Sequence, residues 1–138
     1  MQPSIIAIAG LKGGTGKTTT AIYLAASIHK RDLLVTVIDA DSEQSALNWS
    51  MGGLLFPVVA MDTKLAKQAK ALKEQGHIVM IDCSPNNRDV LLLAAMIADH
   101  VIVPTSVSGA EVNRLEATLD LLVQVEESRD KDLVSILL

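Results

Sequence analysis

The chain has 138 residues, of which 49% are apolar and 20% charged, and this length and composition suit one domain spanning residues 1–138. The single cysteine excludes an internal disulfide and a multi-cysteine zinc or iron–sulfur site within one chain, and it favours a reducing, cytoplasmic compartment. The net charge of −4 argues against a globally basic nucleic-acid binder. No uninterrupted apolar run reaches the ~18 residues needed to span a bilayer, so we expect no membrane association.

Apolar runs typical of buried strands alternate with segments of helical periodicity. Strands are expected at residues 4–9, 33–39, 55–61, 77–82, 100–103 and 133–138. Helices are expected after the first strand up to residues 30–31, in a short segment ending at Trp49, and at 64–75, 88–98 and 110–128. Pro57 cannot donate a hydrogen bond to a strand ladder, so its strand is expected at an edge of the sheet.

This alternation predicts an α/β fold, a doubly wound and mostly parallel sheet with helices on both faces. Ligands of such folds bind at the carboxyl ends of the strands, which would bring together the loops after residues 9, 39 and 82. The last helix is expected to turn its apolar stripe toward the sheet. That stripe consists of Val112, Leu115, Leu119 and Leu122.

A glycine-rich segment at residues 10–20 lies between the first strand and the first helix. Its glycines Gly13, Gly14 and Gly16 allow consecutive backbone N–H groups to approach a polyphosphate, and the start of the helix favours negative charge. Lys17 would supply a charge to the β- and γ-phosphates, and Thr18 a hydroxyl to Mg²⁺. The segment is therefore predicted to be a phosphate-binding loop.

Two of the predicted strands end in a carboxylate. Asp39 and Asp82 each follow an apolar run, and the pattern before Asp82 is typical of a Walker B strand. Mg²⁺ is usually held by one or two carboxylates together with nucleotide phosphates. The predicted metal ligands are therefore Thr18, Asp39 and Asp82.

Residues 12–19, Lys-Gly-Gly-Thr-Gly-Lys-Thr-Thr, resemble the deviant Walker A box of the ParA/MinD family of ATPases, in which a lysine precedes the glycines. Residues 36–50, including Asn48-Trp49-Ser50, and residues 98–104 look most similar to the short plasmid partition ATPases of the ParA/ParF kind. The resemblance implies a P-loop NTPase of the nitrogenase iron-protein-like branch that uses ATP or ADP with Mg²⁺. The implied nucleotide-binding residues are Lys12, Gly13, Gly14, Thr15, Gly16, Lys17, Thr18 and Thr19.

The same resemblance implies the catalytic residues Lys12, Lys17 and Asp41. Lys12 would reach the nucleotide of a second subunit in a nucleotide-dependent homodimer, and Asp41, in a D-x-D box with Asp39, would orient the attacking water. Hydrolysis would drive plasmid or chromosome partition together with a ParB-like adaptor. The ATP-bound protein would be associated with the nucleoid through nonspecific DNA binding.

Departures from the family pattern are also present. Ser42-Glu43 stands where relatives commonly have Pro-Gln, with Gln44 one residue further on, and Cys83-Ser84-Pro85 replaces the frequent Thr-Pro-Pro. Relatives continue past this length with segments that hold adenine and, in many, DNA, so a truncated member of the family is expected. Two alternatives are a MinD-like membrane-associated positioning ATPase and a metabolic P-loop enzyme of the synthetase type.

Other polar residues are read as structural. The lysines at positions 64, 67, 70 and 73 are spaced around their helix and are expected to be solvated surface rather than a DNA-binding face. Cys83 is expected to be a packed loop residue, because no basic partner that would activate it is evident.

Overall fold

The computed structural model describes most of the chain, including every predicted helix and strand. The described residues are 2–10, 16–41, 44–50, 52–53, 55–60, 64–83, 87–105, 109–130 and 134–137. Residues 11–15 of the predicted phosphate-binding loop lie outside the described ranges. The predictions for Lys12, Gly13, Gly14 and Thr15 therefore stay predictions.

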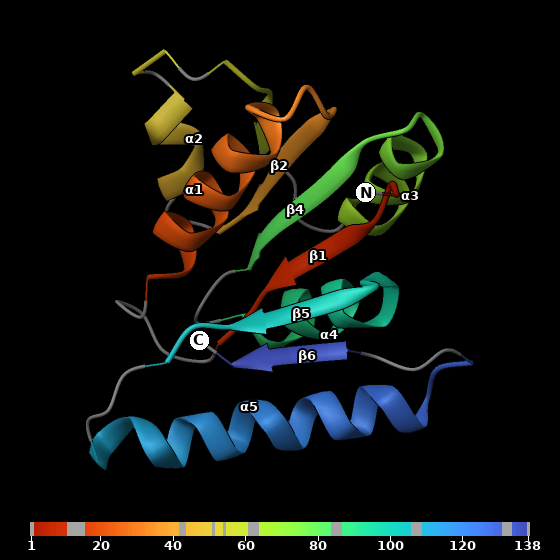
Figure 1. Ribbon diagram of the computed structural model, residues 1–138. Helices are drawn as coiled ribbons and strands as arrows, with labels where there is room; N and C mark the ends of the chain where they lie inside the picture. Colours follow the sequence, from red (N-terminus) through yellow and green to blue (C-terminus); the bar gives the residue numbers. More distant parts are fainter. Residues whose placement is uncertain are drawn as a thin grey trace.

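Six strands form one sheet in which every observed pairing is parallel (Figure 1). In chain order they are β1 (Ile5–Ile8), β2 (Val35–Ala40), β3 (Val58–Ala60), β4 (Ile78–Cys83), β5 (His100–Val103) and β6 (Val134–Leu137). Their order across the sheet is β3-β2-β4-β1-β5-β6, which confirms the doubly wound fold. The short β3 lies at an edge, as Pro57 predicted, and the Pro57 carbonyl accepts the N–H of Val37 at 3.0 Å.

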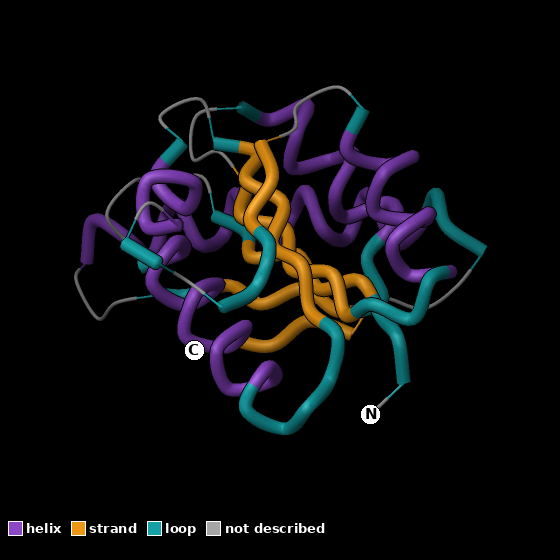
Figure 2. The backbone as a smooth tube through the Cα atoms, turned by 90° about the horizontal axis from the view of Figure 1, so that it is seen from above, coloured by secondary structure: helices purple, strands orange, loops and turns teal. Residues whose placement is uncertain are grey.

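Helices cover both faces of this sheet (Figure 2). They are α1 (Lys17–His29), α2 (Ser45–Ser50), α3 (Leu65–Glu74), α4 (Arg88–Ile97) and α5 (Gly109–Glu127). α1 and α2 share one aliphatic cluster with Ile6 and Ile8, whereas α3, α4 and α5 share another with Ile5 and Ala7. Alternate residues of β1 thus enter opposite cores, as the two-residue period of a strand requires. Because both faces are covered, β1 is apolar throughout.

The structure shifts several predicted strand boundaries: β1 and β3 are shorter than predicted, and the shifts of β2 and β4 have a physical cause. β2 begins at Val35 rather than at residue 33, because Leu34 is 58% exposed and lies outside the core. β4 continues to Cys83, which was expected in the following loop. Cys83 is 1% exposed and pairs in register with Ala40, so it completes the strand, and burial raises the pKa of its thiol.

The inner face of α5 also differs from the predicted stripe. Leu122 is buried as expected, and Leu115 and Leu119 pack at the margin of the core. The fully buried positions also include Thr118, Leu121 and Val125, which were not predicted; the side chain of Val112 is outside the description. Residues 118, 121, 122 and 125 follow helical spacing, but the polar Thr118 interrupts a pattern read from apolar residues alone.

The amino ends of the strands are tied together by Asp99, which precedes β5. Its Oδ2 accepts the backbone N–H of Ile5 at 2.8 Å and a hydrogen bond from Lys73 Nζ of α3, also at 2.8 Å. Burial raises the pKa of Asp99, but these hydrogen bonds and nearby positive charge outweigh burial, so the pKa lies below its ordinary value. The sequence predicted that Lys73 is solvated surface. The structure shows that its ammonium is also part of an ion pair.

Candidate functional site

The site lies where α1 begins, at the carboxyl ends of β1, β4 and β2. Gly16 precedes α1 with a φ of +83°, and its carbonyl accepts the N–H of Thr20 at 2.8 Å in the first helical turn. An added Cβ would meet nothing within 4 Å, so the backbone conformation, rather than a lack of space, requires glycine here. The helix thus begins directly after a left-handed glycine and leaves its first N–H groups at the phosphate-loop end.

Thr18 and Asp82 contact each other directly. The Thr18 hydroxyl donates to Asp82 Oδ2 at 2.7 Å, although the two residues are far apart in the sequence. Asp82 is 1% exposed, and burial raises its pKa to about 6; the hydrogen bond from Thr18 opposes this increase. The charges of Asp39 and Asp41 also contribute to this raised pKa, whereas that of Lys17 opposes it. The structure therefore joins the predicted Walker A hydroxyl to the predicted Walker B carboxylate.

Lys17 is buried beside these carboxylates. Only 5% of the residue is exposed, and burial lowers the pKa of its ammonium, while the negative charges of Asp82 and Asp41 raise it. Burying an ammonium costs free energy unless nearby negative charges compensate its lost hydration, and here the carboxylates do so in part. Such perturbed groups gather preferentially at functional sites.

Asp39 lies beside Asp82 in the sheet register but directs both oxygens to backbone groups. Its Oδ2 accepts the N–H of Leu47 at 2.7 Å, in the first turn of α2, and its Oδ1 accepts the N–H of Asp41 at 3.0 Å. Burial raises its pKa, and these N–H groups oppose the increase. Sequence reasoning missed the contact with α2 because Asp39 lies too far before the helix to fit a capping pattern.

Asp41 is half-buried and follows β2 directly. Its carbonyl accepts the N–H of Gln44 at 3.0 Å, and Gln44 itself is exposed, with a φ of +54°. Both backbone groups of Asp41, its N–H and its carbonyl, are therefore hydrogen-bonded. Thr19 is exposed on the first turn of α1. The structure thus brings Lys17, Thr18, Asp39, Asp41 and Asp82 to one end of the sheet.

The oxygen groups at this site fit a hard cation held partly by a ligand. Within the described residues, no group of three or more His, Cys, Asp or Glu side chains could hold a metal ion. A protein hydroxyl and a carboxylate, as in the pair Thr18 and Asp82, suit Mg²⁺, which takes its remaining oxygens from phosphates and water. The site therefore fits a nucleotide-bound cation better than a free-standing metal centre. Among the described helices, none is long and apolar enough to cross a membrane.

Comparisons with known proteins agree with this arrangement. Residues 6–134 match the family described as "CobQ/CobB/MinD/ParA nucleotide binding domain". The chain is 34% identical over 133 residues to "Maintenance of carboxysome distribution protein A" of Gloeobacter kilaueensis, covering 90% of this chain and 55% of that protein. It is 24% identical over 132 residues to "Protein ParA" of Rhizobium radiobacter, covering 92% of this chain and 60% of that protein.

The fold is also found in a solved relative. Cobyrinic acid a,c-diamide synthase from Mycobacterium smegmatis, with bound ADP and magnesium, superposes with a TM-score of 0.76 at 23% identity, covering 98% of this chain and 72% of the other. The chain spans 55% and 60% of the two curated relatives named above. Its P-loop segment, parallel sheet and family match agree, and the chain belongs to the CobQ/CobB/MinD/ParA family of nucleotide-binding domains.

Proposed function

We propose that this chain is the nucleotide-binding part of an ATPase that binds ATP with Mg²⁺ and hydrolyses it to ADP. The observation that carries the proposal is the 2.7 Å hydrogen bond between Thr18 and Asp82 beside the buried Lys17. These groups stand at the start of α1, where backbone N–H groups favour a phosphate. The solved relative that holds ADP and magnesium on the same fold supports the choice of ligand.

Each described side chain has a role in this proposal. Thr18 and Asp82 would hold Mg²⁺, which supplies neutralisation of phosphate charge. Lys17 would contact the β- and γ-phosphates. Its ammonium is buried near the carboxylates at the carboxyl end of the sheet, where the phosphates would lie. Asp41, held by its backbone beside Asp39, would orient the attacking water. Catalysis of this kind rests mainly on positioning and charge neutralisation.

For Asp39 we propose a role other than the predicted one. Its assignment as a third metal ligand stays a prediction, and both of its oxygens accept backbone N–H groups in this structure. We infer that it anchors α2 and the Asp41 turn. This anchoring would keep Asp41 in place during the reaction.

The biological output we propose is partition of a plasmid or chromosome. The relatives named for ParA and for carboxysome distribution support a protein that positions a cargo. The ATP-bound form would be a homodimer in which Lys12 of each subunit reaches the other's nucleotide. It would bind nonspecific DNA, work with a ParB-like adaptor, and reside in the cytoplasm on the nucleoid.

Measuring phosphate release and light scattering with ATP and Mg²⁺ tests this proposal. The wild-type chain is expected to hydrolyse ATP and to double its mass with ATP but not with ADP. Lys12→Ala is expected to keep nucleotide binding and lose dimerisation, whereas Lys30→Ala, at the exposed end of α1, should behave as wild type. A chain that binds ATP yet stays monomeric and inert would contradict the dimer mechanism, and one that binds no nucleotide would contradict the whole proposal.

A metabolic synthetase is the second candidate, because the solved relative with bound ADP is a synthase of this fold. Co-sedimentation with DNA separates the two. A partition ATPase should pellet with DNA in ATP and not in ADP. Indifference of DNA binding to the nucleotide would favour the synthetase.

A further inference from the structure

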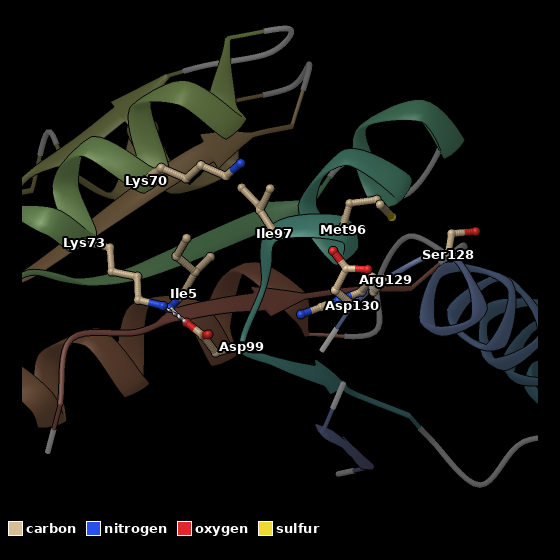
Figure 3. Close-up of a pocket in the computed structure, with 9 residues that line it drawn as sticks. All are labelled: Ile5, Lys70, Lys73, Met96, Ile97, Asp99, Ser128, Arg129 and Asp130. Atoms are coloured by element: carbon tan, nitrogen blue, oxygen red, sulfur yellow. Dashed lines mark hydrogen bonds and ion pairs between the residues drawn. The ribbon is translucent and has the colours of Figure 1, made fainter. Parts of the chain in front are cut away.

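A pocket of about 420 Å³ lies at the amino ends of the strands, the opposite end of the sheet from the phosphate loop (Figure 3). It is formed where β1 and β5 begin and where α3, α4 and α5 end. We call it the amino-end pocket. No residue of the nucleotide site lines it, so a ligand could occupy it together with a nucleotide.

Three cationic side chains converge on the amino-end pocket from two distant segments. Lys70 and Lys73 come from α3, and Arg129 follows α5. Figure 3 shows the Lys70 side chain reaching from α3 toward Ile97. Arg129 is far from the two lysines in the sequence, and only the fold brings the three side chains together.

The three cations differ in how far they are already engaged. Lys73 pairs with Asp99 at 2.8 Å. Arg129 Nη1 donates to the carbonyl of Ala95 at 2.6 Å, and the contacts among the described residues engage no other N–H group of this guanidinium. Among the described contacts, none engages the ammonium of Lys70. The pocket therefore keeps cationic donors for an anionic group.

An apolar strip continues from the pocket along α4. Met96 lines the pocket and is 42% exposed, and Leu93, one turn earlier on the same side of the helix, is 38% exposed. Methionine side chains adapt to varied partners and recur at such binding surfaces. The strip extends beyond the pocket, so it suits a ligand longer than a small anion.

We propose that the amino-end pocket docks an acidic and apolar peptide segment of a partner protein. A carboxylate of that segment would pair with Lys70 and Arg129, and an adjacent apolar side chain would lie on Met96 and Leu93. The argument is charge complementarity beside apolar surface, the combination that gives peptide docking both its orientation and its affinity. This function is separate from nucleotide hydrolysis and does not depend on it.

A nucleic acid fits the same surface less well. Duplex DNA carries one charge per about 1.7 Å of axis and needs an extended basic surface. The remaining lysines of α3, Lys64 and Lys67, do not line the pocket, so the cations do not continue along the helix as one basic face.

The test is a binding titration of the whole chain without nucleotide. The probe is a short fluorescein-labelled peptide in which glutamates flank a pair of leucines, followed by fluorescence anisotropy. The same peptide with lysines in place of the glutamates, and a labelled DNA duplex, are the competing ligands. We expect saturable binding of the acidic peptide only, with amide shifts at Ile5 and Ile97 in NMR spectra.

Two charge reversals on one helix form the matched pair of variants. Lys70→Glu should weaken peptide binding about tenfold or more, whereas Lys67→Glu, exposed and outside the pocket, should change it less than about twofold. Unchanged melting temperatures would show that both variants fold. The proposal is overturned if the acidic peptide does not bind, if both variants weaken it equally, or if DNA competes for the same residues. Because no nucleotide is present, such a failure leaves the proposed ATPase untouched.

Discussion

The two ends of the sheet treat a buried carboxylate in opposite ways. At the carboxyl end, burial, together with the charges of the neighbouring carboxylates, raises the pKa of Asp82 to about 6. At the amino end, hydrogen bonds from Lys73 and Ile5 outweigh burial and hold the pKa of Asp99 below its ordinary value. Asp82 has too little positive charge nearby to offset its burial, whereas Asp99 has enough hydrogen bonds and positive charge to do so.

This difference separates a binding site from a structural contact. Asp99 is matched by partners within the chain, so its charge contributes to the stability of the fold. The carboxylates around Asp82 outnumber their cation Lys17, and a bound Mg²⁺ would supply the missing charge. The comparison predicts that activity depends on the carboxyl end, that neutralising Asp82 there stabilises the nucleotide-free fold, and that breaking the ion pair of Asp99 at the amino end destabilises it.

The largest effect is expected for Lys17→Ala. Removing this ammonium takes away the charge closest to the proposed phosphate position, and ATP hydrolysis should fall about 100-fold or more. Steady-state phosphate release measures the effect, with Lys30→Ala as the control at the exposed end of the same helix. Hydrolysis at the wild-type rate would remove Lys17 from the mechanism.

Asp39→Ala is expected to have the next largest effect. It leaves the N–H groups of Leu47 and Asp41 without their acceptor and should loosen α2, lowering kcat about tenfold while leaving the Mg²⁺ requirement unchanged. Titrating hydrolysis with Mg²⁺ distinguishes this anchoring role from direct metal binding. An increased Mg²⁺ midpoint at an unchanged kcat would favour the sequence-based assignment of Asp39 as a ligand.

Asp82→Asn is expected to stabilise the nucleotide-free fold. The pKa of Asp82 is raised on folding from 3.8 to about 6, so the stability present below the lower value is lost as the pH rises through the higher one. At about pH 7.5 asparagine avoids this loss, and the free energy of unfolding should increase by about 1–3 kcal/mol. Urea unfolding measures the gain, which should vanish below about pH 4; a variant less stable than wild type at both pH values would refute the electrostatic explanation.

The smallest effect is expected for Lys73→Ala at the amino end. Both side chains of its ion pair are partly exposed, so water screens the pair and the loss should be about 0.5–1 kcal/mol. The pKa of Asp99 is lowered on folding, so this contribution is present above the unfolded pKa and disappears as the pH falls through the folded one. Thermal unfolding at neutral and acid pH should show it, with Lys67→Ala as the control.

Local sequence patterns predicted most of this fold and much of the site. Apolar runs located the strands, Pro57 marked the edge strand, and the spacing of glycine, Lys17 and Thr18 indicated the phosphate loop. Asp82 was predicted as a site residue because a carboxylate follows a buried apolar run, a pattern visible in a single sequence.

The contacts that the sequence did not reveal are long-range. The bond from the Leu47 N–H to Asp39 depends on where α2 packs, and the pair of Lys73 with Asp99 joins a helix to a strand distant in sequence. Thr118 was missed because a buried hydroxyl does not appear in an apolar pattern. Such contacts follow from tertiary packing, which periodicity alone does not specify.

NMR titration of the carboxyl carbons of Asp82 and Asp99, with and without Mg²⁺ and a non-hydrolysable ATP analogue, tests the difference between the two ends most directly. Without ligand, Asp82 should titrate near 6 and Asp99 below its ordinary value. The ligand should lower the pKa of Asp82 sharply and leave that of Asp99 unchanged. An Asp82 that titrates at its ordinary value, or that does not respond to the ligand, would contradict the assignment of the carboxyl end as a nucleotide and Mg²⁺ site.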